Sequence, residues 1–186
     1  MQGFLYIDKP DGWTSFDVVA YVRKMVARMD GKKPKHVKVG HTGTLDPAAT
    51  GLLVLCIGKE YTKQVTGLIR HDKTYQVELT LGKTSTTGDR EGEITEVSAT
   101  EPSKIDVETA IASFIGEIEQ VPPKFSALKV NGKRAYELAR EGKEVVLQPR
   151  KVTIHSIEDL TYNYPIISFT TSVGSGTYIR SLAEDI

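Results

Sequence analysis

The sequence predicts an α+β fold in which a mixed, mostly antiparallel central sheet is flanked by helices. Apolar residues make up 39% of the 186 residues and charged residues 26%, a composition typical of a globular protein and not of a disordered chain. Strand-like and helix-like segments mix without the regular alternation of a doubly wound sheet. The length fits one domain, covering residues 1–186, with a substantial core.

The first part of the chain is expected to form strands and two helices around one long loop. Its expected elements are, in order, a strand (3–8), a turn (9–12), a helix beginning after Thr14, an extended piece (36–40), a loop (40–51), a buried strand (52–57) and a helix (59–69). Thr14 and Asp17 fit a capping box, since each side chain can bond the backbone N–H of the other. The apolar face of that helix is expected to comprise Val18, Val22, Met25, Val26 and Met29.

The second part of the chain is expected to build most of the sheet. Its expected elements are a strand (75–81), a polar loop (83–92), a helix (106–114), a basic insertion (about 120–150), two strands (150–160 and 166–173) and a helix start (177–186). Residues 75–81 alternate between apolar and polar, which is typical of a strand with one buried face. The last helix stops at Ile186 without a cap, so we expect the native protein to continue beyond it.

Charge is segregated along the chain although the net charge is zero. Residues 23–38 hold seven bases and one acid, and residues 124–151 hold eight bases and three acids. Between them, residues 89–119 hold nine acids and two bases. If the two basic segments converge in space, they form a positive surface suited to a polyanion such as RNA. The alternative is that both are ordinary solvated faces.

Several classes of function are not expected from this sequence. It has no apolar run long enough to span a membrane and no signal peptide. Its one cysteine, Cys56, lies in an apolar strand and is expected to be a small core residue. The four histidines lack the spacing of metal ligands, so we expect no metal. Gly82-Lys83-Thr84 is not a phosphate-binding P-loop, because Val77 stands where the first glycine is needed. A reduced, cytoplasmic protein is expected.

One loop has the features of a reactive site. Residues 40–51 read GHTGTLDPAATG and lead directly into the buried strand. Pro47 holds the preceding Asp46 in an extended conformation, and the glycines permit the close approach of another molecule. An acid on a loop that a core strand holds in place is well suited to chemistry. The alternative for an Asp-Pro pair is a structural turn.

The stretch GHTGTLDPAATGLL resembles the signature of the TruB family of bacterial tRNA pseudouridine-55 synthases. Four other segments resemble motifs of this family in the same order along nearly the whole chain. They are IDKPDGWTSFDVV (7–19), HDKTYQVELTLG (71–82), QVPPKFSALKVNGKRAYELAREG (120–142) and GTYIRSLAEDI (176–186). The family pattern has a further C-terminal part of the catalytic domain and often a small RNA-binding module, which this sequence lacks. The resemblance implies the pseudouridine synthase fold, with residues 120–150 as a thumb-like insertion.

The resemblance also implies the catalytic residues. Asp46 matches the aspartate nucleophile, which attacks either the uracil ring or the ribose carbon; the sequence leaves this open. Tyr75 matches the tyrosine that stacks under the uracil and can take part in proton transfer. Arg180 matches the arginine that is expected to pair with Asp46 and to keep it ionised. The implied reaction converts a uridine of the TΨC arm of tRNA to pseudouridine.

Four other residues are implied to bind the substrate. His41 matches the histidine that fills the space left by the everted base, with a loop-stabilising hydrogen bond as the alternative. Tyr178 is expected to help wall the uracil, Lys63 to bind a phosphate, and Lys9 to support the reactive loop. The insertion would grip the tRNA arm. No metal or organic cofactor is implied, and a monomer is expected.

Two other functions remain open at this stage. The protein could be an RNA-binding or RNA-folding protein that has the same fold and lacks the chemistry. It could also modify ribosomal RNA with the help of a guide RNA. The presence of Asp46, Tyr75 and Arg180 argues against the first, and the basic insertion favours direct recognition of RNA over the second.

Overall fold

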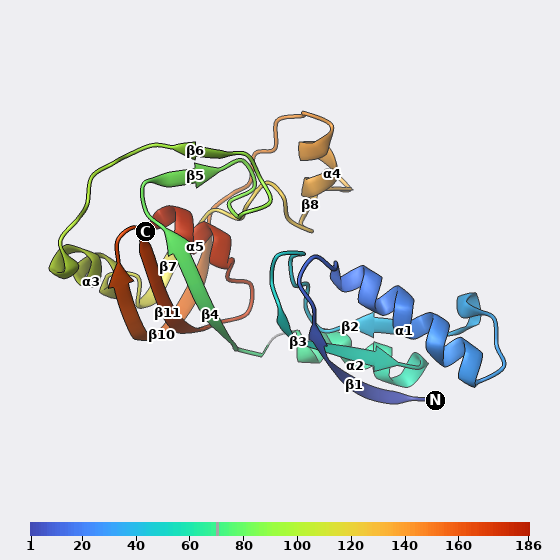
Figure 1. Cartoon of the computed structure of the whole chain (residues 1–186). Helices are drawn as coiled ribbons and strands as arrows, with labels where there is room; N and C mark the ends of the chain where they lie inside the picture. The colour runs from blue at the N-terminus through green and yellow to red at the C-terminus, as the bar shows by residue number, and fades with distance from the viewer. Residues whose placement is uncertain (70) are drawn as a thin grey trace. The chain divides into compact units, whose positions relative to one another are not determined.

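The chain forms two compact units, each built on its own antiparallel sheet. The computed structural model describes residues 1–69 and 71–186, and the units are Met1–His71 and Asp72–Ile186. Every strand pair of the described chain is antiparallel. The predicted α+β class and the antiparallel pairing are therefore confirmed, with the strands divided between the two units (Figure 1).

The first unit is a three-stranded sheet with two helices. Its elements are β1 (Gly3–Lys9), α1 (Ser15–Met29), a short 3-10 helix (Pro34–His36), β2 (Val39–His41), β3 (Gly51–Ile57) and α2 (Lys59–Leu68). The strand order is β1-β3-β2, so the apolar β3 is the central strand, as its composition predicts. The two expected strands at 3–8 and 52–57, the helices and the long loop are confirmed here to within two residues. The extended piece expected at 36–40 is shorter, since β2 covers 39–41 and the 3-10 helix, which was not predicted, ends at His36.

The core of the first unit lies between α1 and the sheet. Val18, Val22 and Val26 recur at helical spacing and pack against Leu53 and Leu55 of β3. The predicted capping box fixes where this helix begins. The Asp17 N–H donates to Thr14 Oγ1 over 3.0 Å, and the Thr14 N–H donates to Asp17 Oδ2 over 2.9 Å. The expected helix start is confirmed, and Val18, Val22 and Val26 of the expected apolar face are buried.

The apolar face of α1 extends beyond the buried core. Met25 and Met29, predicted on the buried face, are 48% and 71% exposed. With Trp13 and Tyr21 they line an apolar hollow of about 420 Å³ between α1 and β1. Helical periodicity finds the apolar stripe correctly, but it does not say how far the neighbouring sheet reaches across that stripe.

The second unit holds a four-stranded sheet and two small ribbons. Its elements are β4 (Lys73–Thr80), β5 (Lys83–Ser85), β6 (Ile94–Glu96), α3 (Lys104–Ala112), β7 (Gly116–Gln120), β8 (Lys129–Val130), β9 (Lys133–Arg134), α4 (Ala135–Arg140), β10 (Arg150–Asn163), β11 (Ile166–Val173) and α5 (Ile179–Asp185). The main sheet has the order β4-β11-β10-β7, and β5-β6 and β8-β9 form the ribbons. Sequence analysis missed β7 and placed β5 in a polar loop.

One face of the larger sheet carries the core of the second unit. Buried and half-buried residues alternate along β11, and its buried side includes Ile167 and Val173. α3 and α5 pack into the same cluster through Ile111 and Leu182. Because Leu182 is fully buried there, α5 is fixed against the sheet, and the residues at its start are fixed with it.

Replacing Leu55 by alanine is expected to lower the free energy of unfolding by about 2–5 kcal/mol, because it leaves a cavity at a fully buried position of β3. Leu52→Ala on the same strand is the control, since Leu52 is 67% exposed; its effect should stay within ~0.5 kcal/mol. Urea denaturation of both variants measures this, and equal losses would show that the burial of β3 is misassigned.

The capping box should make the stability of the first unit depend on pH. Hydrogen bonds from the Thr14 hydroxyl and backbone N–H hold the pKa of Asp17 below its ordinary value of 3.8. A lowered pKa in the folded state means that the stabilisation is present above the unfolded pKa and is lost as the pH falls through the folded pKa. The difference in melting temperature between the wild type and Asp17→Asn should therefore shrink between about pH 5 and about pH 2. A constant difference would contradict the ionised cap.

Candidate active site

The loop that connects β2 to β3 is anchored on both sides of Asp46. The Thr42 N–H donates to the Val54 carbonyl over 3.0 Å, which ties the start of the loop to the central strand. The Ala49 N–H donates to the Asp46 carbonyl over 3.0 Å and closes a turn around Pro47. Asp46 itself is half-buried. The predicted nucleophile therefore lies on a backbone that hydrogen bonds hold in place.

Lys9 secures the residue that follows Asp46. Its side chain is fully buried, and its Nζ donates to the carbonyls of Pro10, Trp13 and Pro47 at 2.8, 2.6 and 3.1 Å. A buried ammonium is costly unless its donors are satisfied, so the three carbonyls must stay in place around it. The Gly12 N–H donates to the same Pro47 carbonyl over 2.9 Å. This contact supports the predicted role of Lys9 beside the loop.

Ser15 secures the residue that precedes Asp46. Its hydroxyl donates to the Leu45 carbonyl over 3.0 Å and accepts from the Leu45 N–H over 2.9 Å. Ser15 is 2% exposed at the start of α1. Sequence analysis missed this residue, because a serine after a capping threonine is an ordinary helix start. The two neighbours of Asp46 are thus both held by hydrogen bonds: Pro47 by the end of β1 and Leu45 by the start of α1.

His41 and Lys63 lie elsewhere in the first unit. His41 ends β2, and its Nδ1 donates to the Gly43 carbonyl over 2.8 Å, the loop-stabilising bond considered as the alternative for this residue. Because a carbonyl oxygen only accepts, that bond places a proton on Nδ1. Lys63 is exposed on α2 and forms an ion pair of 3.1 Å with Glu60. An exposed pair of this kind contributes little stability, so the ammonium remains available to a phosphate.

In the second unit, Tyr75 lies on the core face of the larger sheet. It belongs to β4, opposite Thr171 of β11, and packs half-buried at the margin of the core. Val77 and Leu79 follow it on the same face and are buried. The alternation of the strand therefore decides which way this tyrosine faces.

Arg180 is largely buried, unlike an ordinary cation on a helix surface. Its guanidinium donates to the carbonyls of Thr87 and Phe125 at 2.8 and 3.0 Å. Asp89 Oδ2 lies 3.7 Å from its Nη1, and the two side chains are only 16% and 12% exposed. These contacts fix the direction of a rigid, fork-shaped donor.

The loop that holds Arg180 is itself ordered by hydrogen bonds. Asp89 Oδ1 accepts from the Thr87 hydroxyl over 2.6 Å and from the Glu91 N–H over 3.0 Å. Gly88 has φ +72°, and a side chain there would meet Glu184 at 2.9 Å and Arg180 at 3.4 Å. The positive φ favours glycine at this position, since other residues rarely adopt that backbone conformation. Asp89 escaped the sequence analysis because it lies in a polar loop with several other acids.

Tyr178 precedes α5 and is held through both its backbone and its ring. Gln120, which is fully buried at the end of β7, donates to the Tyr178 carbonyl over 3.0 Å and accepts from its N–H over 2.8 Å. The Arg150 guanidinium lies 4.7 Å from the centre of the Tyr178 ring. Neither Gln120 nor Arg150 was predicted as a site residue, since their partners are far away in the sequence.

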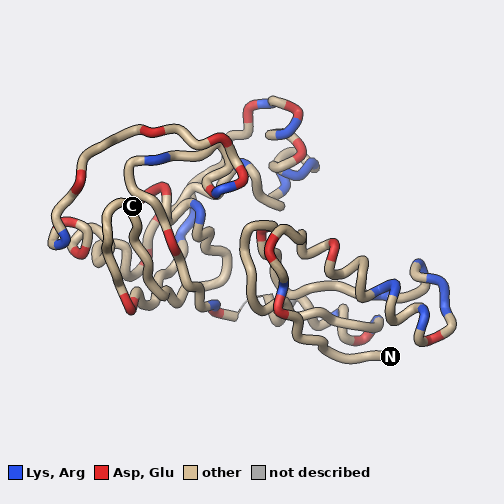
Figure 2. Tube along the Cα trace, in the orientation of Figure 1, with Lys and Arg blue, Asp and Glu red and all other residues tan. Residues whose placement is uncertain are grey.

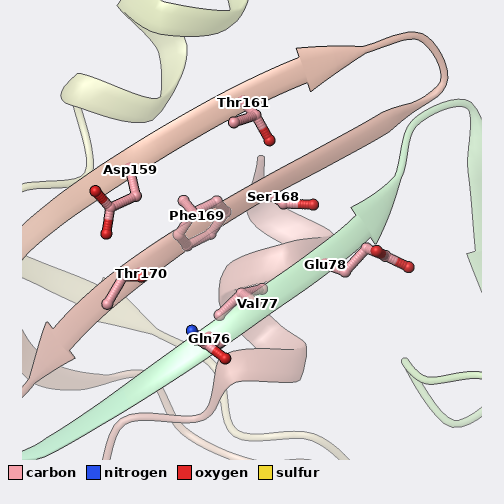
Figure 3. A pocket seen from close by; sticks show the side chains of 8 residues that line it. All are labelled: Gln76, Val77, Glu78, Asp159, Thr161, Ser168, Phe169 and Thr170. Atoms are coloured by element: carbon pink, nitrogen blue, oxygen red, sulfur yellow. The ribbon is translucent and has the colours of Figure 1, made fainter.

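A hollow on the opposite face of the larger sheet does not contain the predicted residues. It measures about 420 Å³ and is lined by residues of β4, β10 and β11 (Figure 3). Glu78 and Asp159 bring carboxylates to it, and Ser168 and Thr170 bring hydroxyls. Two carboxylates oppose the binding of a phosphate backbone. The hollow lies where the pairing of β10 with β11 shifts register, near Asp159.

Positive charge gathers on the predicted insertion. Figure 2 shows Lys and Arg along the segment that contains β8, β9 and α4. Its first part is tied to α5, since the Ser181 hydroxyl donates to the Val121 carbonyl over 2.7 Å. The other basic segment, residues 23–38, belongs to the first unit. The expected convergence of the two segments stays a prediction.

The remaining titratable groups add little chemistry to the site. Burial raises the pKa of Glu184 above its ordinary value; Asp185 adds to the rise and Arg180 opposes it. Burial also raises the pKa of the Cys56 thiol, which is fully buried as predicted. Among residues 1–69 and 71–186, no three His, Cys, Asp or Glu side chains are grouped as metal ligands. None of the helices in this described part is both long and apolar enough to cross a bilayer.

The structure therefore organises the predicted residues as two sets. The first unit holds Asp46 between residues that Lys9 and Ser15 anchor. The second unit holds Arg180 and Tyr178 at the start of α5, which packs on the same sheet face as Tyr75. The predicted pairing of Asp46 with Arg180 joins the two units and stays a prediction.

Comparison with known proteins agrees with these motifs. Residues 30–179 match the family described as TruB family pseudouridylate synthase (N terminal domain). The tRNA pseudouridine synthase B of Clostridium kluyveri is 50% identical over 186 residues, which cover this whole chain and 61% of that protein. The tRNA pseudouridine synthase B of Bacteroides fragilis is 47% identical over 183 residues, covering 98% of this chain and 77% of that protein. The chain thus spans about three fifths of the length of the first of these relatives.

Chains of two solved structures have a fold similar to that of this chain. A chain of a Cbf5-Nop10-Gar1 complex has a TM-score of 0.66 and 27% identity, covering 97% of this chain and 42% of that one. A chain of an H/ACA RNP bound to a substrate RNA containing 2′-deoxyuridine has a TM-score of 0.65 and 25% identity, covering 97% and 40%. From its sequence motifs, its fold and these relatives, the chain belongs to the TruB family of pseudouridylate synthases.

Proposed function

We propose that the whole protein converts uridine 55, in the TΨC arm of tRNA, to pseudouridine. The observation that carries the proposal is the anchored loop around Asp46, in a chain that is 50% identical to a protein named tRNA pseudouridine synthase B. A carboxylate held by the residues on both sides of it is positioned before the substrate arrives, and such preorganisation lowers the cost of reaching the transition state.

The chemistry is an isomerisation in which no atom is gained or lost overall. The bond from ribose C1′ to uracil N1 breaks, the base turns, and a new bond forms from C1′ to C5. The proton on C5 then leaves, and N1 takes up a proton. Asp46 acts as the nucleophile, on either the uracil ring or C1′. Attack on the ring would keep the base covalently bound while it turns, whereas attack on C1′ would form an ester with the ribose and leave the free base to turn within its pocket. Arg180 pairs with Asp46 in the assembled site and keeps it ionised.

The target uridine lies within a folded RNA loop, so it must be everted before reaction. We assign Tyr75 to stack under the everted uracil and to take part in the proton transfer from C5. Tyr178 forms another wall of the pocket, and His41 occupies the space that the base leaves. Lys63 binds a phosphate, and Lys9 keeps the loop of Asp46 in place. The bond from Lys9 Nζ to the Pro47 carbonyl supports this last role.

The insertion of residues 120–150 grips the tRNA arm. Its lysines and arginines supply charge without base readout, which suits a substrate recognised by its shape. We expect the protein to act as a monomer in the cytoplasm.

Two alternatives remain distinguishable by experiment. A guide-dependent enzyme would leave unguided tRNA unmodified, whereas the present proposal requires turnover with tRNA alone. A protein that only binds RNA would keep its full biological activity when Asp46 is replaced by asparagine. The higher identity to the tRNA enzymes, 50% against 27% for the chain of the Cbf5 complex, favours unguided tRNA as substrate.

Asp46→Asn in the whole protein should abolish the release of tritium from tRNA labelled at uracil C5. We expect a loss of at least about 1,000-fold, because the amide cannot act as the nucleophile. The dissociation constant for tRNA should change little. Asp159→Asn is the matched control, since Asp159 is an exposed acid outside the proposed site. Wild-type rates in Asp46→Asn would refute the assigned nucleophile.

Lysines of the insertion should contribute to the salt dependence of tRNA binding. Lys129→Gln and Lys133→Gln should each lower the slope of log K against log salt by about 0.7–0.9, because each neutralised phosphate releases counterions. Lys104→Gln on α3 is the control, since that lysine lies in the acidic segment and pairs with Glu108. Filter binding over a series of salt concentrations measures the slopes. Unchanged slopes in both insertion variants would contradict the proposed grip.

A further inference from the structure

The two ends of the basic insertion both clasp the segment that carries Tyr178 and Arg180. The insertion leaves the sheet after Gln120, the last residue of β7, and returns at Arg150, the first residue of β10. These two residues are paired across the sheet, so the ends of the insertion lie side by side. Each of them contacts Tyr178 by a different kind of interaction.

Gln120 contacts the backbone of Tyr178. Its amide nitrogen donates to the Tyr178 carbonyl, and its amide oxygen accepts from the Tyr178 N–H, at 3.0 and 2.8 Å. The side chain is fully buried. An apolar side chain there would leave both backbone groups of Tyr178 without this partner, so the position selects an amide that can donate and accept together.

Arg150 contacts the ring of Tyr178. Its guanidinium carbon lies 4.7 Å from the ring centre, and its Nη2 donates to the Gly176 carbonyl. Gly176 has φ +93°, and its backbone lies against the guanidinium, since a side chain there would come within 3.6 Å of Nη2. A planar cation stacked on an aromatic ring limits the angles which that ring can take.

Two more hydrogen bonds connect the start of the insertion to α5. The Ser181 hydroxyl donates to the Val121 carbonyl over 2.7 Å, and Arg180 Nη2 donates to the Phe125 carbonyl over 3.0 Å. Gln120, Val121 and Phe125 therefore contact three residues at the start of α5: Tyr178, Ser181 and Arg180, respectively. Hydrogen bonds therefore join the start of the insertion to the residues at the start of α5.

We infer that Gln120 and Arg150 are positioning residues, through which the ends of the RNA-gripping insertion set the Tyr178 ring and the Arg180 guanidinium. This inference rests on the proposed function and adds to it. The insertion binds the RNA, and its ends also position Tyr178 and Arg180, which face the uridine. Loss of either the Gln120 hydrogen bonds or the Arg150 contact with the Tyr178 ring should slow the chemical step and leave the tRNA affinity unchanged.

The test separates binding from chemistry in the whole protein. Gln120→Met keeps the length and volume of the side chain and removes both hydrogen bonds. Arg150→Lys keeps the positive charge and removes the planar stack. The rate constant for pseudouridine formation with enzyme in excess should fall between about tenfold and a hundredfold in each variant, because small displacements of positioning groups have effects of this size. The tRNA dissociation constant should stay within about twofold.

Glu119→Gln is the matched control for Gln120→Met. It changes the neighbouring residue of β7, whose side chain is exposed, and should leave both quantities at wild-type values. Hydrogen exchange of the Tyr178 amide gives a readout independent of activity. It should be faster in Gln120→Met than in the wild type, because its acceptor has been removed.

Each outcome tests either the positioning role of Gln120 and Arg150 or the proposed function on which that role rests. If the wild type itself does not form pseudouridine, the proposed function fails. If the wild type is active and both variants keep its rate constant, the positioning role is wrong. If the tRNA affinity falls in proportion to the rate constant, the two residues contribute to RNA binding and do not position Tyr178 and Arg180. Should Gln120→Met fail to fold, as its melting temperature would show, Arg150→Lys alone decides.

Discussion

The buried ammonium of Lys9 is the interaction on which the candidate active site depends. An ammonium without water must satisfy three donors, and the carbonyls of Pro10, Trp13 and Pro47 do so at 2.6 to 3.1 Å. Two of these carbonyls belong to the turn after β1, and the third to the loop of Asp46. The charge therefore joins two segments 38 positions apart in the sequence. Moving the loop would leave part of a buried charge unsatisfied, and this cost keeps the proposed nucleophile in place.

Arg180 shows the same strategy in the second unit. Its charge is also taken out of water and satisfied by backbone carbonyls, with Asp89 as the nearby carboxylate. Backbone carbonyls hold a cation in a fixed direction without neutralising it. The guanidinium is thus oriented by its surroundings. In our proposal it also pairs with the carboxylate of Asp46.

The placement of the insertion accounts for how one fold combines RNA binding with catalysis, the two roles that we propose for this family member. The insertion interrupts the sheet between β7 and β10, which are adjacent strands, so its ends are held by the sheet's own pairing. The first turn of α5 packs on those ends through hydrogen bonds. Most basic residues of the insertion are exposed, whereas Gln120 at its start is fully buried and Arg150 at its end is half-buried. In our proposal, the charge that binds RNA and the contacts that order the site thus come from different parts of one segment.

The sequence by itself determined the α+β class, most of the helices and strands, the capping box of α1 and the family. These follow from local periodicity and from motifs that are contiguous in the chain. Only the tertiary structure showed that Ser15, Asp89, Gln120 and Arg150 support the candidate site. Each of them contacts a partner 28 to 91 positions away, and nothing in the neighbouring sequence marks it. Periodicity likewise found the apolar stripe of α1 without showing that Met25 and Met29 stay exposed. Burial and hydrogen-bond satisfaction depend on which segments meet, and that is decided by the packing of the whole chain.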